Sequence, residues 1–267
     1  MEILIWIVLI VIAVTAIILL LLALIEPHRP EFTTIRLTDL GDPDLRILFF
    51  TDLHSDISFV KSEFITDIIE KQKPDAVIFG GDITVNMNYF DKGAAFLNRI
   101  KECCSGLNIP FYGVTGNHDR NLTPEQEEAA GFINLEHQYR FIEGRSGKKF
   151  ILSGVDDSGR FERVWFEPME VPEGYKHILV VHDPDAVLHF ASLEGIDYVL
   201  SGHIHGGQVR TPFGLEFIIR HDELPKKGIF MGVHNFGNTK VFISRGLGCS
   251  RLPIRLGSRP EVSLIEF

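Results

Sequence analysis

The pattern of apolar and polar positions divides the chain into two parts. Residues 3–25 read ILIWIVLIVIAVTAIILLLLALI and contain one polar residue, Thr15. A helix of 23 residues extends about 34 Å, which is enough to cross the hydrocarbon core of a bilayer. A buried core helix is the alternative, but a helix this long that is apolar on every side seldom occurs in a domain of this size. We therefore predict a transmembrane anchor over residues 1–25.

The anchor is expected to remain attached and to set the topology. Its start, ME, contains no basic residue, and LLALIEP at its end offers no small-residue cleavage site, so a cleaved signal peptide is disfavoured. Arg29 and Arg36 follow the run, whereas the tail before it has no Lys or Arg, which favours a cytoplasmic domain. The odd cysteine count and the neighbours Cys103 and Cys104 indicate no disulfide framework, in agreement with that side.

Beyond the anchor, continuously apolar runs alternate with segments of helical spacing. Residues 26–44 are typical of a connector followed by an edge strand, and a single domain is expected over 45–267. In its first half, helices alternate with strands predicted at 45–54, 74–82 and 109–119; the helices are predicted at 58–73 and 87–104. Strands separated by helices in this way predict parallel pairing, and strands that are apolar throughout predict a sheet covered on both faces.

The second half of the domain repeats the same design with fewer helical segments. Strands are predicted at 149–157, 177–184 and 196–208, and the tail from TPFGLEFIIR to PEVSLIEF is rich in strand-forming residues. The order of elements therefore favours an α/β fold. Ligands in such folds bind beyond the carboxyl ends of the strands, where polar residues follow the apolar runs here.

Five short polar motifs stand at those strand ends: TDLH, GGD, GNHD, VVHDP and GHIH. Each motif alone is compatible with a plain turn or a structural histidine. Together they place oxygen and imidazole ligands at one edge of the sheet, and none of them contains a Cys, which disfavours a thiolate zinc site. The candidate residues are Asp52, His54, Asp82, Asn117, His118, Asp119, His182, His203 and His205.

Net charge limits the partners of the domain. The formal charge is −10 at pH 7, which argues against a nucleic-acid surface because such a surface needs a basic patch. It does not exclude a small phosphate substrate, since bound cations reverse the sign of the charge locally.

The five motifs, in this order, resemble those of the calcineurin-like metallophosphoesterase superfamily. The segments LSGHIHGGQVRTPFG and SRGLGCSRLPIRLGSRPEVSLIEF resemble its bacterial, membrane-anchored branch, and the resemblance covers almost all of 45–267. It implies a four-layer αββα sandwich and a site for two divalent metal ions. Manganese is favoured, with iron, zinc and magnesium as alternatives, because mixed carboxylate, amide and imidazole ligands suit several metals.

The resemblance also implies a role for each candidate residue. Asp82 would bridge the two metals, His118 would protonate the leaving oxygen or stabilise the charged transition state, and Asp119 would orient His118. The remaining ligands would be Asp52, His54 and His205 for the first metal and Asn117, His182 and His203 for the second. Four arginines could reach substrate phosphates or form solvent-facing ion pairs: Arg120, Arg245, Arg251 and Arg255.

The expected activity is hydrolysis of a phosphodiester or pyrophosphate by a metal-bridging hydroxide. The anchor favours a lipid-linked substrate, and one similar group of enzymes hydrolyses the pyrophosphate of UDP-2,3-diacylglucosamine. Two alternatives stay open at this point. The first is a non-catalytic, metal-bound scaffold, and the second is a tethered phosphatase or cyclic nucleotide phosphodiesterase that acts on soluble substrates.

Overall fold

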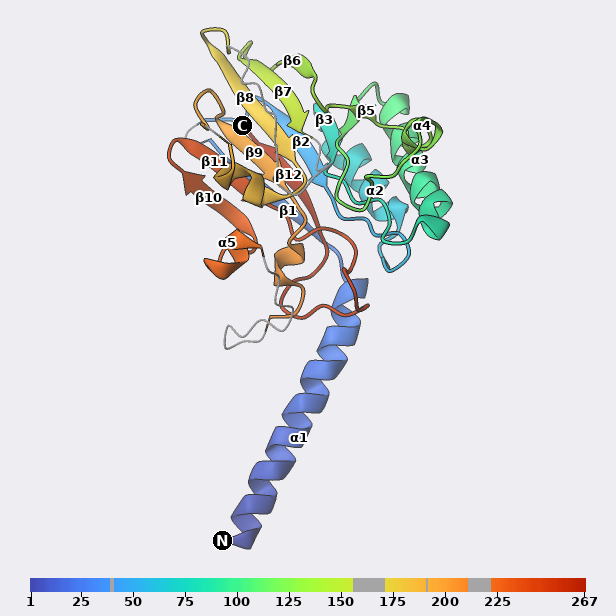
Figure 1. The fold of residues 1–267 in the computed structure, drawn as a ribbon, viewed down its shortest axis with the longest axis vertical. Coiled ribbons are helices and arrows are strands. Elements are labelled where there is room, and N and C mark those ends of the chain that lie inside the picture. Colours follow the sequence, from blue (N-terminus) through green and yellow to red (C-terminus); the bar gives the residue numbers. More distant parts are fainter. Residues whose placement is uncertain (39–40, 156–170, 191, 211–221) are drawn as a thin grey trace.

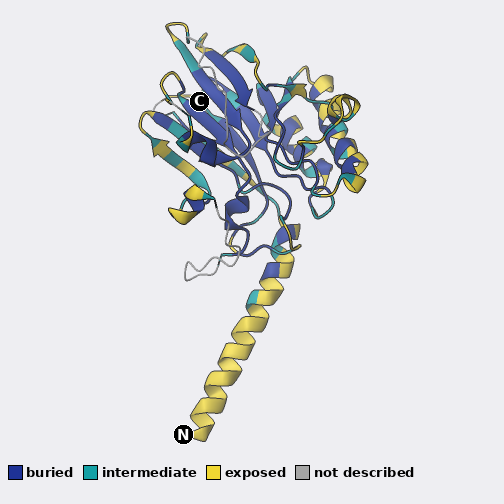
Figure 2. Cartoon of the chain, in the orientation of Figure 1, coloured by how far each residue is buried: buried dark blue, intermediate teal, exposed yellow. Residues whose placement is uncertain are grey.

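The computed structural model describes residues 1–38, 41–155, 171–190, 192–210 and 222–267 (Figure 1). Helix α1 (Glu2–Ile25) projects from the rest of the molecule, and nearly all of its side chains are exposed (Figure 2). The helix is long and apolar enough to cross a membrane. It therefore fits the single-pass anchor that its sequence predicts, and a short 3-10 helix, η1 (Glu26–His28), connects it to the domain.

The domain contains two sheets of six strands each. In the first sheet the order is β1-β12-β2-β3-β4-β5, and all neighbours are parallel except β12 and β2. Its strands are β1 (Glu31–Arg36), β2 (Arg46–Phe50), β3 (Ala76–Phe79), β4 (Phe111–Gly113), β5 (Ile133–Asn134) and β12 (Glu261–Glu266). The parallel pairing predicted for the first half is confirmed, and β1 is an edge strand.

The second sheet has the order β10-β11-β9-β8-β7-β6. Its four central strands are parallel, and the two edge strands are antiparallel to their neighbours. The strands are β6 (Tyr139–Glu143), β7 (Lys149–Val155), β8 (Tyr175–Val181), β9 (Tyr198–Ser201), β10 (Gly232–Phe236) and β11 (Thr239–Ile243). The strand-rich tail is thus confirmed in part, and its portion at 211–221 lies outside the described residues, as do positions 156 and 157 of the strand expected at 149–157.

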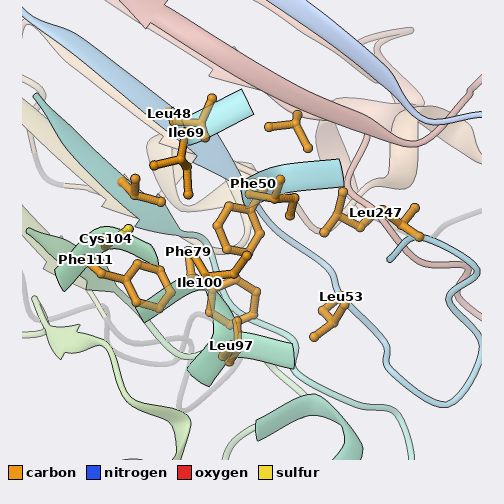
Figure 3. Packing of buried hydrophobic residues seen from close by; sticks show 14 of the residues in the cluster. Leu48, Phe50, Leu53, Ile69, Phe79, Leu97, Ile100, Cys104, Phe111 and Leu247 are labelled. Carbon is orange, nitrogen blue, oxygen red and sulfur yellow. The ribbon is translucent and has the colours of Figure 1, made fainter. Parts of the chain in front are cut away.

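Helices cover the outer face of each sheet, which gives the four layers that the resemblance implies. Side chains of α2 and α3 pack on β2, β3 and β4 of the first sheet (Figure 3). Within the described residues, the outer face of the second sheet is covered by the short helices η3 and α5. The helices are α2 (Ser62–Gln72), η2 (Met87–Tyr89), α3 (Phe90–Gly106), α4 (Pro124–Ala130), η3 (Pro184–Leu188), η4 (His205–Gly207) and α5 (Glu223–Lys226).

A third group of buried apolar side chains lies between the two sheets and fixes their relative position. Phe49 of β2 and Ile78 of β3 face Leu152, Val180 and Leu200 of the second sheet, and all five are fully buried. Burying a side chain of this size stabilises a fold by about 1.5–3 kcal/mol. With both sheets held in this way, the carboxyl ends of β2, β3, β4, β8 and β9 can meet at one edge.

Candidate metal centre

Each candidate ligand lies directly after a strand, where the chain leaves the apolar interior. Residues 52 and 54 follow β2, residue 82 follows β3, residues 117 and 118 follow β4, residue 182 follows β8, and residues 203 and 205 follow β9. All are buried except Asn117 and His118, which are half-buried. The two sheets thus bring all of the predicted ligands to one place.

The first group of ligand atoms comes from both sheets. The Nε2 atoms of His54 and His205 are 3.1 Å apart. Asp82 Oδ2 lies 3.5 Å from His54 Nε2, and Asp52 Oδ1 lies 3.5 Å from His205 Nε2. Two imidazole nitrogens and two carboxylate oxygens within this distance can surround one metal ion.

The second group shares Asp82 with the first. His182 Nε2 is 3.2 Å from Asp82 Oδ2, and His203 Nδ1 is 3.2 Å from His182 Nε2. Asn117 Oδ1 is buried without a hydrogen-bond partner in the described part of the protein. A buried amide oxygen with no donor is costly unless a cation takes the donor's place, so this atom fits a metal ligand.

The protonation of the histidine rings explains why these ring nitrogens and carboxylate oxygens can bind cations. The Nδ1 atom of His182 contacts the carbonyl oxygen of Gly80 at 2.8 Å. A carbonyl only accepts, so this Nδ1 carries the proton and Nε2 of His182 turns a lone pair toward Asp82. Burial lowers the pKa of His54 to about 4, which keeps its ring neutral at pH 7. Acceptor atoms therefore converge on two points, and two divalent ions fit this donor set.

Five of the ligand residues adopt the left-handed backbone conformation that non-glycine residues rarely occupy. Their φ angles lie between 40° and 67°, at positions Asp52, His54, Asp82, His203 and His205. Each such residue costs about 1–2 kcal/mol, and strain of this kind collects at functional sites. The sharp turns aim successive side chains at one centre, which an extended strand cannot do.

Close packing around the ligands requires glycine at the neighbouring position Gly81. Its φ is +96°, and a Cβ there would lie 2.6 Å from the backbone nitrogen of Gly116. The GGD and GNHD motifs therefore touch through their glycines, which brings Asp82 beside Asn117.

Asp119 is buried at the same edge but has different contacts from those that the resemblance implies. Its carboxylate accepts the backbone N–H groups of Asp82, Ile83 and Gly116, at 2.7–2.9 Å. Those contacts hold the bridging residue and the GNHD turn together, and among the described residues the carboxylate has no hydrogen bond to the ring of His118. Burial and the negative charge of Asp82 raise the pKa of Asp119 to about 7, and the backbone donors oppose that rise.

His118 lies at the rim of the two groups. Its backbone N–H donates to Asp82 Oδ1 at 2.8 Å, and its ring meets the ring of His54 edge-on, with the ring centres 5.3 Å apart. The half-buried side chain is therefore fixed beside the buried ligands while it stays open to solvent. This position suits proton transfer to a substrate bound over the ligands.

Two contributing residues were not recognised from sequence. Asp183 Oδ2 lies 3.3 Å from Nε2 of His203, the nitrogen opposite the one that faces His182. A carboxylate in this position orients an imidazole ligand and raises its basicity. Its signal was available, because Asp183 directly follows His182 in VVHDP.

The other residue is Arg255, for which the sequence offered the wrong alternatives. It neither faces solvent nor reaches toward a phosphate, because it is fully buried. Its Nε donates to the carbonyl oxygen of Gly248 at 3.0 Å, and its Nη2 lies 3.2 Å from Nδ1 of His205. Arg245 forms ion pairs with Glu31 and Glu261. Arg255 thus supports a metal-ligand loop from behind.

Comparison with known proteins agrees with this geometry. The sequence profile described as calcineurin-like phosphoesterase matches residues 45–207, which include all nine candidate residues. The metallophosphoesterase YkoQ of Bacillus subtilis is 31% identical over 231 residues, covering 84% of this chain and 83% of its own. The phosphodiesterase YaeI of Escherichia coli is 31% identical over 262 residues, covering 91% of this chain and 90% of its own.

Solved structures give a more distant likeness. A dimetal phosphatase from Danio rerio is 12% identical with a TM-score of 0.48, over 85% of this chain and 100% of that one. The family profile and the bacterial relatives carry the assignment: the chain belongs to the calcineurin-like phosphoesterase family and is a hydrolase of phosphoester bonds.

Proposed function

We propose that the protein is a membrane-anchored phosphoesterase with two divalent metal ions that hydrolyses a phosphodiester or pyrophosphate. The observation that carries the proposal is the position of Asp82. One oxygen of this buried carboxylate lies 3.5 Å from His54 Nε2 and 3.2 Å from His182 Nε2. A carboxylate between two imidazole groups is the natural bridge for a pair of cations.

Each ion would take three further ligands from the clusters described above. A metal pair supplies charge neutralisation at the phosphoryl oxygens and activation of a water molecule. We assign the first ion to Asp52, His54 and His205, and the second to Asn117, His182 and His203. Manganese is the proposed metal, because oxygen and imidazole ligands without thiolate accept it readily.

His118 is the proposed general acid. When the bond between phosphorus and the leaving oxygen breaks, that oxygen needs a proton, and the half-buried ring of His118 can supply it from above the ligands. Asp119 is proposed as a positioning residue, because its carboxylate holds the backbone on both sides of the bridge. Neither residue is assigned as a ligand.

The first prediction tests the catalytic assignment. The full chain in detergent should hydrolyse bis-p-nitrophenyl phosphate when Mn²⁺ is added. His118→Ala should lower kcat by about 10²–10⁴-fold while metal binding persists, and Asp82→Ala should lose activity and weaken binding of both metal ions, because Asp82 is their shared ligand. His234→Ala is the matched control, since His234 lies on β10 and its ring Nε2 contacts the carbonyl oxygen of Met231 at 3.0 Å.

Activity that is equal in His118→Ala and in the unmodified protein would exclude His118 as the acid. No turnover by the unmodified protein on any phosphoester, with two metals bound, would favour the scaffold alternative. A panel of phosphomonoesters, cyclic nucleotides and nucleoside-diphosphate lipids on the same preparation would separate the soluble-substrate alternative from a lipid-linked substrate such as UDP-2,3-diacylglucosamine.

We propose that the catalytic domain lies on the cytoplasmic side. Arg29 and Arg36 follow the span, and the three cysteines are free. A membrane-impermeant thiol reagent applied to intact cells should leave an exposed engineered cysteine, Phe141→Cys, unlabelled. Labelling of that cysteine without cell lysis would place the domain outside.

A further inference from the structure

The last turns of α1 are not free of the domain, although most of the helix is. The loop 250–256 lies against them, where the red trace meets the end of α1 (Figure 1). The backbone N–H of Arg255 donates to the carbonyl oxygen of Ala23 at 3.0 Å. Ile254 and Leu256 pack with Ala23 and Leu19 in one apolar cluster, which explains the buried patch near the end of an otherwise exposed helix (Figure 2).

This contact fixes the loop at the height of the membrane surface. The apolar run of 23 residues extends about 34 Å, whereas the hydrocarbon core is about 30 Å thick. Only the last few ångströms of α1 can therefore project from the core. Leu19 stands six residues before the end of the helix, about 9 Å below it. A loop packed between Leu19 and Ala23 must consequently meet the boundary between acyl chains and headgroups.

The loop is held rigidly from the side of the domain. Gln208, which is buried, donates from Nε2 to the carbonyl oxygens of Leu252 and Ile254 at 2.8 and 2.9 Å. Its Oε1 accepts the backbone N–H of Ser250 at 2.8 Å. One buried amide side chain thus fixes three points of the loop, and ordering of this kind removes conformations in which the exposed tip could fold back onto the domain.

The tip of the loop carries the side chains that suit a lipid surface. Leu252 is 56% exposed beside the exposed Arg251 and Pro253, and Arg251 has no ion-pair partner among the described residues. Phe59 is 41% exposed, and its ring packs on His28 of η1, just beyond the end of α1, with the ring centres 4.0 Å apart. Aromatic, aliphatic and arginine side chains grouped at this depth are typical of membrane interfaces.

We propose that the loop 250–256, together with Phe59, is a membrane-docking surface that seats the domain on the bilayer. Leu252 enters the outer edge of the acyl region, and Arg251 contacts the phosphates of anionic headgroups. The bilayer is the committed partner because the surface is continuous with the membrane span itself.

The surface also sets the distance from the lipid to the metal centre. A single residue connects them, since Arg255 contacts Ala23 through its backbone and both Gly248 and His205 through its guanidinium. The candidate metal ligands therefore lie one arginine side chain from the end of the span. Resting on the proposed function, this placement predicts that the enzyme acts on phosphoesters held at headgroup level.

Docking is tested without reference to activity. Leu252→Cys in a Cys103→Ser background is labelled with the fluorophore NBD and reconstituted in vesicles of phosphatidylcholine and phosphatidylglycerol that contain a doxyl-labelled lipid. The emission at position 252 should shift to shorter wavelength and be quenched by the doxyl group. Phe141→Cys is the matched control, because Phe141 is 62% exposed on the edge strand β6. Equal quenching at the two positions would overturn the proposal.

A second measurement tests the consequence for substrates. Leu252→Gln should lower kcat/KM toward a phosphodiester lipid in those vesicles by about tenfold, while turnover of water-soluble bis-p-nitrophenyl phosphate stays unchanged. Phe141→Gln should change neither. An equal loss on both substrates would overturn the link between docking and substrate class. Inactivity of the unmodified protein on both would overturn the proposed function, and the quenching result would still decide the docking surface.

Discussion

At the scale of single residues, the site is formed by backbone conformation as much as by residue type. Asp52 and His54 are two positions apart, which on a regular strand would place both side chains on one face and carry the chain straight on. Both instead have positive φ, and the same holds for His203 and His205. The chain thus turns at each ligand. Such strain is stable only where the surroundings overdetermine it, and Asp119 provides part of that restraint through three backbone donors.

A second prediction follows for Asp119. Asp119→Ala leaves three buried N–H groups without an acceptor, which costs about 1–3 kcal/mol for each lost partner. We expect metal affinity, measured by calorimetric titration, to fall about 10–100-fold, while the acidic limb of the residual pH–rate profile stays in place. Asp44→Ala is the control, because Asp44 accepts from Ser146 near the start of β2, away from the ligands. A displaced acidic limb with unchanged metal affinity would show that Asp119 acts through His118 instead.

At the scale of elements, apolar runs located the strands but not their ends. The run 45–54 contains β2, which ends at Phe50, and the run 109–119 contains β4, which has three residues. Residues beyond those ends are buried as well, and burial alone does not distinguish a strand from a tight turn. Conversely, the helical spacing at 58–73 agrees with α2, which buries Ile65, Ile68 and Ile69 and half-buries Phe64.

The end of α2 gives a third prediction. Lys73, the C-cap residue, is exposed and has φ 47° and ψ 62°, a left-handed conformation that glycine adopts without steric cost. Lys73→Gly should therefore raise the free energy of unfolding by about 1 kcal/mol in urea titrations. Glu70→Gly, at an exposed position inside the same helix, should lower it by about 1 kcal/mol. If both substitutions destabilise the protein equally, the cap is not strained.

At the scale of the whole molecule, pairing between distant segments could not be predicted. The last strand, β12, inserts between β1 and β2, parallel to one and antiparallel to the other, and nothing in its local sequence specifies those partners. The pairing nevertheless matters for the site, because it brings the segment 244–258 behind the ligands and against α1. Motif order and the polar residues that follow the strands were readable from sequence, whereas the supports Arg255 and Gln208 depend on this long-range arrangement.

Metal binding should therefore stabilise the whole domain, which is the fourth prediction. Without cations, buried acceptor atoms face one another, as with Asp82 Oδ2 and His182 Nε2 at 3.2 Å. A ligand at 100 times its dissociation constant stabilises the folded state by about 2.7 kcal/mol, which corresponds to roughly 5–10 °C in Tm for a domain of this size. Adding EDTA to the full chain in detergent should lower Tm by at least that amount, and excess Mn²⁺ should restore it.

Asp82→Asn separates this effect from a general action of the chelator. The amide has the same size as the bridging carboxylate but carries no negative charge. The substitution therefore weakens the binding of both metal ions together. The Tm of this variant should respond little to EDTA or Mn²⁺. A Tm that is insensitive to EDTA and Mn²⁺ in the unmodified protein would contradict a metal centre at this edge of the sheets.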